Sequence, residues 1–134
     1  MTDLAKRAVA CKHWRWMPGM LIRTIGGPTD RIAGIDATYI HAWAESQQSE
    51  NPRGMWIRYR RGRMEKHGVP DLTDPATLGC LLSLVESLHG VAWLEPCPTI
   101  GWFCTYGKRG TPDKESTYAM TRAEALVAAL EAAP

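Results

Sequence analysis

The sequence lacks any long run of apolar residues. A membrane-spanning helix needs about 20 consecutive apolar residues, and no stretch of the 134-residue chain approaches that length. The opening residues, from Met1 to Arg7, also lack the apolar core of a secretory signal peptide. We therefore expect a cytoplasmic protein that has no membrane partner.

Net charge is also low. The chain has 16 Lys and Arg residues and 14 Asp and Glu residues, which gives a formal net charge of +2 at pH 7. A field this weak does not by itself attract a nucleic acid. Any electrostatic argument for a partner therefore depends on where the charges lie along the chain.

Cysteine and histidine are too scattered to predict a metal centre. The four cysteines, at positions 11, 80, 97 and 104, form no Cys-x-x-Cys pair, and structural zinc sites usually take their ligands from such pairs. Cys11 with His13 is the nearest approach, but a site there would need distant cysteines to join it. We expect no metal and no cofactor, and we expect the cysteines to be free thiols buried as small hydrophobic side chains.

Catalytic signatures are missing as well. The chain has no Gly-x-Ser-x-Gly nucleophile elbow and no phosphate-binding P-loop. Its four histidines are isolated from one another in sequence. We expect no catalytic residues and a protein that acts by binding; an enzyme with an unrecognised site is the least favoured alternative.

The composition predicts one folded domain that spans residues 1–134. Apolar residues make up 45% of the chain and charged residues 22%, which is typical of a globular protein. Segments rich in β-branched and aromatic residues predict strands at 17–22, 31–36, 38–43, 55–60, 99–106 and 116–120. The segment 38–43 also fits a helix, though less well, and Gly26-Gly27-Pro28 predicts the turn of a hairpin.

Three segments predict helices. One begins at Asp3, a second runs from Asp74-Pro75 to Gly90, and a third follows a capping box formed by Thr121 and Glu124. The order of helices and strands favours an α+β fold over an alternating βαβ array. We predict a mainly antiparallel sheet with two or three helices packed on it.

A basic segment between residues 53 and 66 is the strongest functional signal. Its cations are interleaved with Trp56 and Tyr59, and only Glu65 opposes them. Guanidinium groups bind phosphate oxygens in a fork, and aromatic rings stack on bases. The predicted ligand-binding residues are Trp56, Arg58, Arg60, Arg61, Arg63 and Lys66. Arg58, Arg60 and Arg61 would hold phosphate and Trp56 would stack on a base, while Arg63 and Lys66 add attraction.

Two alternatives for this segment remain open. Arginines on an edge strand discourage aggregation between sheets, and Trp56 can belong to the core, so the segment can be purely structural. If it does bind a partner, an acidic protein surface competes with a nucleotide or a nucleic acid. The sequence does not choose among these partners.

Three blocks of the sequence resemble a group of small accessory proteins from bacteriophage and prophage genomes. The blocks are ACKHWRWMPGM at 10–20, DLTDPATLGCLL at 71–82 and EALVAALEA at 124–132, roughly a quarter of the chain. The resemblance implies an accessory role in the host cytoplasm, such as neutralising a host defence system. It carries over no catalytic residues.

The leading hypothesis is therefore a non-enzymatic anti-defence protein that binds an anionic target, either a nucleotide signal or a nucleic acid. The alternative is an inhibitor that binds a host defence protein directly. A symmetric homodimer is compatible with either hypothesis.

Overall fold

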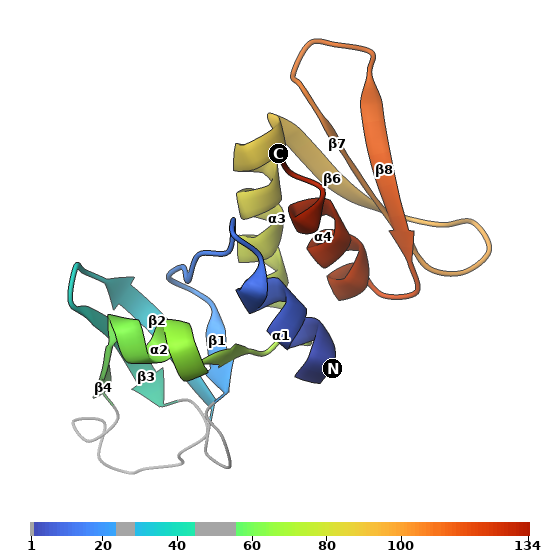
Figure 1. The fold of residues 1–134 in the computed structure, drawn as a ribbon. Helices are drawn as coiled ribbons and strands as arrows, with labels where there is room; N and C mark the ends of the chain where they lie inside the picture. The colour runs from blue at the N-terminus through green and yellow to red at the C-terminus, as the bar shows by residue number, and fades with distance from the viewer. Residues whose placement is uncertain (1, 24–28, 45–55) are drawn as a thin grey trace. The chain divides into compact units, whose positions relative to one another are not determined.

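The computed structural model describes residues 2–23, 29–44 and 56–134 (Figure 1). Its elements are α1 (Thr2–Ala10), β1 (Leu21–Arg23), β2 (Thr29–Ile35), β3 (Tyr39–Ala44), β4 (Trp56–Arg60), α2 (Arg61–His67), β5 (Val69–Pro70), α3 (Pro75–His89), β6 (Val91–Pro96), β7 (Trp102–Gly107), β8 (Lys114–Ala119) and α4 (Arg122–Glu131). All the strand pairings are antiparallel, so the predicted α+β class is confirmed.

The chain divides into two compact units. Residues 16–77 form one unit, and residues 1–15 together with 78–134 form the other. Each unit contains one antiparallel sheet, with the strand order β4-β3-β2-β1-β5 in the first and β6-β7-β8 in the second. None of the described helices is long and apolar enough to cross a membrane.

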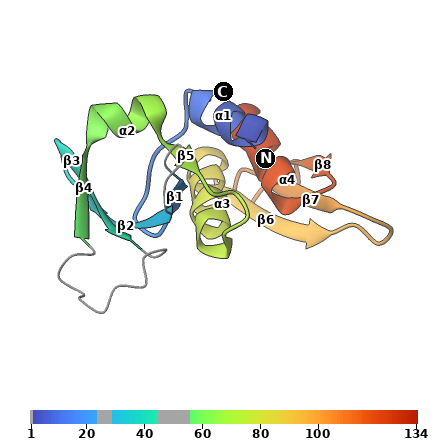
Figure 2. The same cartoon turned by 90° about the horizontal axis from the view of Figure 1, so that it is seen from below.

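In residues 16–77, one face of the sheet is apolar and covered. Ile22, Ile32, Ile40 and Ala42 are almost completely buried. The helix α2 packs against β3 and β4, and its one apolar side chain, Met64, is also buried (Figure 2). The predicted hairpin of β1 and β2 is present, although its turn at 26–28 lies outside the described residues.

The start of α3 confirms the sequence prediction. The Asp74 carboxylate accepts hydrogen bonds from the backbone N–H and the hydroxyl group of Thr77, each at 2.8 Å, as an N-cap does. The Arg31 guanidinium donates to the same carboxylate at 2.6 and 3.0 Å. This one side chain therefore both caps α3 and ties the helix to β2.

The end of α3 also matches the prediction. Gly90 has a positive φ of 116° and donates its N–H to the Glu86 carbonyl at 2.8 Å. Glycine adopts this left-handed conformation without the steric cost of a Cβ atom. The chain can therefore leave the helix and start β6 directly.

In the second unit, α4 covers one face of the sheet. Half of its predicted capping box is present, because the Thr121 hydroxyl accepts a hydrogen bond from the Glu124 N–H at 3.2 Å. The Glu124 carboxylate accepts from the Thr121 hydroxyl at 3.2 Å instead of from the backbone N–H that a full capping box uses. The Thr117 hydroxyl of β8 donates to the Ala125 carbonyl of α4 at 2.7 Å. The helix α1 packs against α4 (Figure 2).

Three elements escaped the sequence prediction. The strand β5 has only two residues, Val69 and Pro70. The helix α2 is short and polar and buries only Met64, so it shows no apolar repeat. The strand β6 begins directly after Gly90 and ends at Pro96. Because turn residues lie at both ends of this short segment, the sequence did not predict a strand there. In addition, α1 begins at Thr2, which places Asp3 in the first turn rather than at the cap.

The prediction that all four cysteines are buried is wrong for three of them. All four are free thiols, but Cys11, Cys80 and Cys97 are partly exposed. They lie after α1, on α3 and in the turn after β6, where one side of the chain faces solvent. Only Cys104 in β7 is buried, and burial raises the pKa of its thiol to about 11.

We predict that Asp74→Ala destabilises the protein, because it removes the N-cap of α3 and the partner of Arg31 together. The free energy of unfolding should fall by about 2 kcal/mol, as measured by urea denaturation followed by tryptophan fluorescence. Asp113→Ala removes an exposed carboxylate between β7 and β8 and should change stability by less than about 0.5 kcal/mol. Equal losses in the two variants would contradict this assignment.

The same carboxylates predict a loss of stability in acid. Burial tends to raise the pKa of Asp74, but hydrogen bonds from Arg31 and Thr77 outweigh it and hold the pKa below its ordinary value. Burial also tends to raise the pKa of Asp71, but hydrogen bonds from Thr73 and Arg23 outweigh that effect and lower the pKa. A carboxyl group with a lowered pKa in the folded state stabilises the protein above its unfolded pKa of about 3.9.

That contribution is lost as the pH falls through the folded-state pKa. We therefore expect the melting temperature to drop as the pH falls from about 5 to about 2. Asn can still cap a helix but does not titrate, so Asp74→Asn should show a shallower drop. The comparison needs only thermal melts followed by circular dichroism, and identical pH profiles would rule Asp74 out as a contributor.

Candidate anion-binding site

Tyr59, in the middle of β4, is anchored to the buried side of its sheet. Its hydroxyl group donates a hydrogen bond to the carboxylate of Asp30, which is completely buried. Burial, followed by the bond to Asp30, raises the pKa of Tyr59 well above its usual range, so the phenol keeps its proton. Because side chains alternate along a strand, this anchor turns Arg58 and Arg60 to the opposite side.

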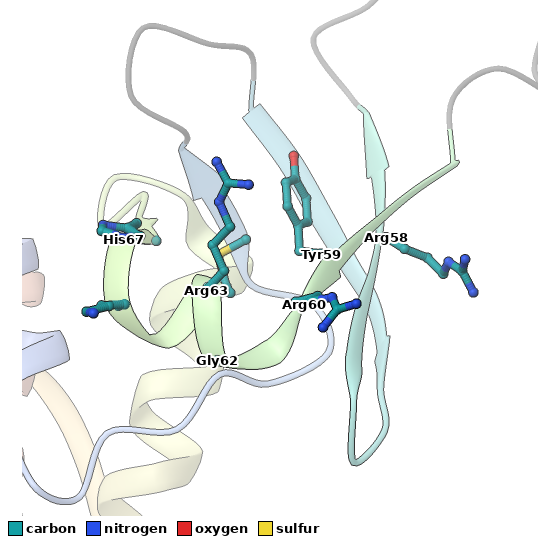
Figure 3. Close-up of a pocket in the computed structure, with 9 residues that line it drawn as sticks. Arg58, Tyr59, Arg60, Gly62, Arg63 and His67 are labelled. Carbon is teal, nitrogen blue, oxygen red and sulfur yellow. The ribbon is translucent and has the colours of Figure 1, made fainter.

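Arg58 lies on the solvent side of β4. Figure 3 shows it pointing away from Tyr59, and the side chain is exposed. Its guanidinium carbon lies 4.6 Å from the centre of the Tyr39 ring in β3. Stacking of this kind uses the flat face of the guanidinium and leaves its N–H donors in the plane available for a ligand.

A carboxylate stands at the edge of this basic surface. His41 is paired with Arg58 across β3 and β4, and its Nε2 lies 2.9 Å from Asp36. The bond with His41, together with the backbone N–H groups of Tyr39 and Thr38, lowers the pKa of Asp36 to about 2. Asp36 is therefore ionised at neutral pH and offsets part of the positive charge on this side of the sheet.

The helix α2 brings more cations to a hollow beside β4. The hollow has a volume of about 1130 Å³, and its described lining residues come from the segment 58–68 (Figure 3). Its basic lining residues are Arg58, Arg60, Arg63, Lys66 and His67. Among the described residues, no aspartate or glutamate lines it.

Helical spacing explains which cations α2 contributes. Residues three and four apart share one side of a helix, so Arg63, Lys66 and His67 lie together while Met64 faces the sheet. Figure 3 shows Arg63 and Tyr59 pointing the same way. Tyr59 is thus the aromatic member of the lining, with its ring held in place by the bond to Asp30.

Arg61 is separated from the other predicted site residues. Its Nε donates to the Glu65 carboxylate at 3.1 Å, a pair spaced i,i+4 on α2, and its Nη1 lies 3.4 Å from the Asp36 carbonyl. Its own N–H donates to the Thr38 carbonyl at 2.9 Å. Arg61 therefore fastens α2 to the turn between β2 and β3 and does not line the hollow.

Of the six predicted binding residues, Arg58, Arg60, Arg63 and Lys66 line the hollow, and the side chain of Arg58 points away from Tyr59 (Figure 3). Arg61 does not join them. Trp56 is paired with Trp43 at the start of β4, but its side chain lies outside what the structure describes.

The sequence prediction missed Tyr39 and His67. His67 lies four residues after Arg63, so a helical interpretation of 61–67 would have placed it on the same side. Tyr39 becomes a partner of Arg58 only through the pairing of β3 with β4, and the sequence alone does not reveal that register.

Other arginines in the described chain form ion pairs with carboxylates. Arg31 pairs with Asp74 at 2.6 Å, Arg23 with Asp71 at 3.1 Å and Arg7 with Glu131 at 2.5 Å. Within the described residues, Arg58, Arg60, Arg63 and Lys66 form no such ion pair, and all four are exposed. No ion pair to another described residue therefore neutralises these four side chains.

The chemistry that this site offers is charge-assisted hydrogen bonding to an anion. Three guanidinium groups and one ammonium group can donate to phosphate or carboxylate oxygens, and the Tyr59 ring adds an apolar surface. Over the described ranges, no three His, Cys, Asp or Glu side chains gather into a potential metal site.

No family model matches the chain, and no curated protein and no solved structure matches it either.

Proposed function

We propose that this chain binds an anionic partner, a nucleotide signal or a nucleic-acid strand, in the hollow between β4 and α2. The observation that carries the proposal is that Arg58, Arg60, Arg63 and Lys66 all line one hollow, with no described carboxylate in its lining. Like charges held close together repel one another. The negative charges of a bound polyanion offset this repulsion, because each cation is then attracted to the ligand.

The size of the site suits a nucleotide as well as a nucleic-acid strand. Pockets for drug-sized molecules measure about 300–1,000 Å³, and this hollow, at about 1130 Å³, is close to the upper end of that range. Its cations come from a strand and from a helix, so they can follow successive phosphates of an extended backbone.

The resemblance to bacteriophage accessory proteins indicates in which biological process this binding would take part. We propose a non-enzymatic anti-defence role, in which the protein sequesters a nucleic acid or a nucleotide signal that a host defence system uses. Direct inhibition of an acidic host protein through the same arginines is the alternative, because arginine and tyrosine are common hot-spot residues at interfaces.

The test is a salt titration with a single-stranded oligonucleotide. We expect a fluorescein-labelled oligothymidylate to bind, with the logarithm of the association constant falling by about 0.7 per neutralised phosphate for each unit of log salt concentration. Arg63→Ala should weaken binding on the order of tenfold, or about 1.4 kcal/mol. It should also make the salt slope shallower by about 0.7. Fluorescence anisotropy measures both quantities.

Arg61→Ala is the matched control, because it removes the same charge from the same helix but from a side chain that is bonded to Glu65. Its affinity should stay within about twofold of the wild type. Equal effects of the two variants would show that net charge alone attracts the oligonucleotide. No binding to oligonucleotides or cyclic nucleotides, combined with salt-sensitive binding to a host protein, would favour the alternative.

A further inference from the structure

The sheet of β6, β7 and β8 carries a second surface of a different character. One side of this sheet presents two adjacent rows of paired residues. The rows are Glu95, Phe103 and Tyr118, and Trp93, Thr105 and Ser116. We call these six residues the aromatic face.

The helix α4 covers the other side of this sheet. Cys104 is completely buried there, and Thr117 donates to the backbone of α4 at 2.7 Å. On the aromatic face, by contrast, Trp93 is 41% exposed and Tyr118 is 49% exposed. Within residues 1–15 and 78–134, the helix with the most contacts to this sheet is α4, which packs on the opposite side.

The exposed apolar side chains concentrate at this face. Four large apolar side chains are strongly exposed among the described residues, and all of them belong to this sheet and its turns: Trp93, Ile100, Tyr118 and Met120. Soluble proteins rarely leave large contiguous apolar patches uncovered unless these bind a partner. Tryptophan and tyrosine are also the residue types that dominate binding energy at protein interfaces.

The aromatic face is held rigid before any partner arrives. The Tyr118 hydroxyl donates to the Ile100 carbonyl at 2.7 Å, and the Phe103 and Tyr118 ring centres are 5.2 Å apart. Gly101, with a φ of 93°, packs so closely that an added Cβ would lie 2.8 Å from the Tyr118 ring. A rigid surface loses little conformational entropy when it binds.

One carboxylate determines the charge of this face. Glu95 is exposed and accepts a hydrogen bond from the Thr105 hydroxyl at 3.2 Å, and Thr105 is in turn 2.9 Å from the Ser116 hydroxyl. Lys114, at the end of the same side, donates its ammonium group to the Lys108 and Thr111 carbonyls at 2.7 and 2.5 Å. Lys114 is therefore engaged elsewhere, and the Glu95 carboxylate can pair with a cation that a partner places between Trp93 and Phe103.

We infer that the aromatic face docks a protein segment that presents an arginine side chain among apolar residues. The arginine pairs with Glu95 and stacks on Trp93, and the apolar residues beside it cover Phe103 and Tyr118. The chain itself places an arginine over a tryptophan on the opposite side of this sheet, where the guanidinium carbon of Arg122 lies 5.3 Å from the centre of the Trp102 ring. This docking is independent of the anion-binding hollow.

A random dodecapeptide display library, selected on the purified full-length chain, tests the inference. Enriched peptides should contain an arginine next to apolar residues. A synthetic copy of an enriched peptide should bind at least about tenfold more weakly to Trp93→Ala and to Glu95→Gln, as measured by isothermal titration calorimetry. Glu95→Gln preserves side-chain shape, so a loss of binding in that variant reports the charge and not the fold.

Two control variants complete the design. Glu115→Gln removes a carboxylate from the same sheet but from its opposite side, and Arg63→Ala alters the anion-binding hollow; both should bind the peptide like the wild type. The inference is overturned if no peptide is enriched, if enriched peptides lack a cation, or if Glu95→Gln binds them normally. It is also overturned if sedimentation shows a homodimer that Trp93→Ala dissociates, because a second copy would then cover the face.

Discussion

The hydrogen bond from Tyr59 to the buried carboxylate of Asp30 is the interaction on which the basic surface depends. It fixes the side of the sheet to which Tyr59 points, and strand alternation then places Arg58 and Arg60 in solvent. A slip of one residue in β4 would turn both guanidinium groups into the apolar interior formed by Ile32 and Ile40. Burying an unpaired charge is far too costly for that register to compete.

Arginine serves two distinct purposes in this chain. Arg31 is partly buried and shares its charge with Asp74, so it links β2 to the start of α3. The cations around the hollow lie at the end of β4 and along α2, where the described chain offers them no carboxylate. Their mutual repulsion destabilises the free protein slightly, and a bound polyanion removes that cost. Arginine thus stabilises the fold where it is paired with a carboxylate, and it serves binding where the described chain offers it none.

Part of this arrangement can be predicted from the sequence, because local chemistry specifies it. The cap at Asp74 and the glycine end of α3 both follow from neighbouring residues, whereas the exposure of Arg58 and Arg60 is seen only in the fold. The helix α2 could not be predicted, since a single buried methionine gives no apolar repeat. Without that helix, the pairing of Arg61 with Glu65 and the placement of Arg63 beside Tyr59 stay hidden. The aromatic face depends on β6, whose pairing with β7 is a property of the fold and not of its own short sequence.

We propose that an external anion contacts the cations of β4 and α2. A nuclear magnetic resonance titration tests this contact by following the arginine Nε–Hε signals and the backbone amides as an oligothymidylate is added. We expect the shifts to concentrate at Arg58, Arg60 and Arg63 and at the amides of residues 58–68, while the Arg31 signal stays in place. Shifts confined to other parts of the chain, or spread evenly over all its arginines, would contradict it.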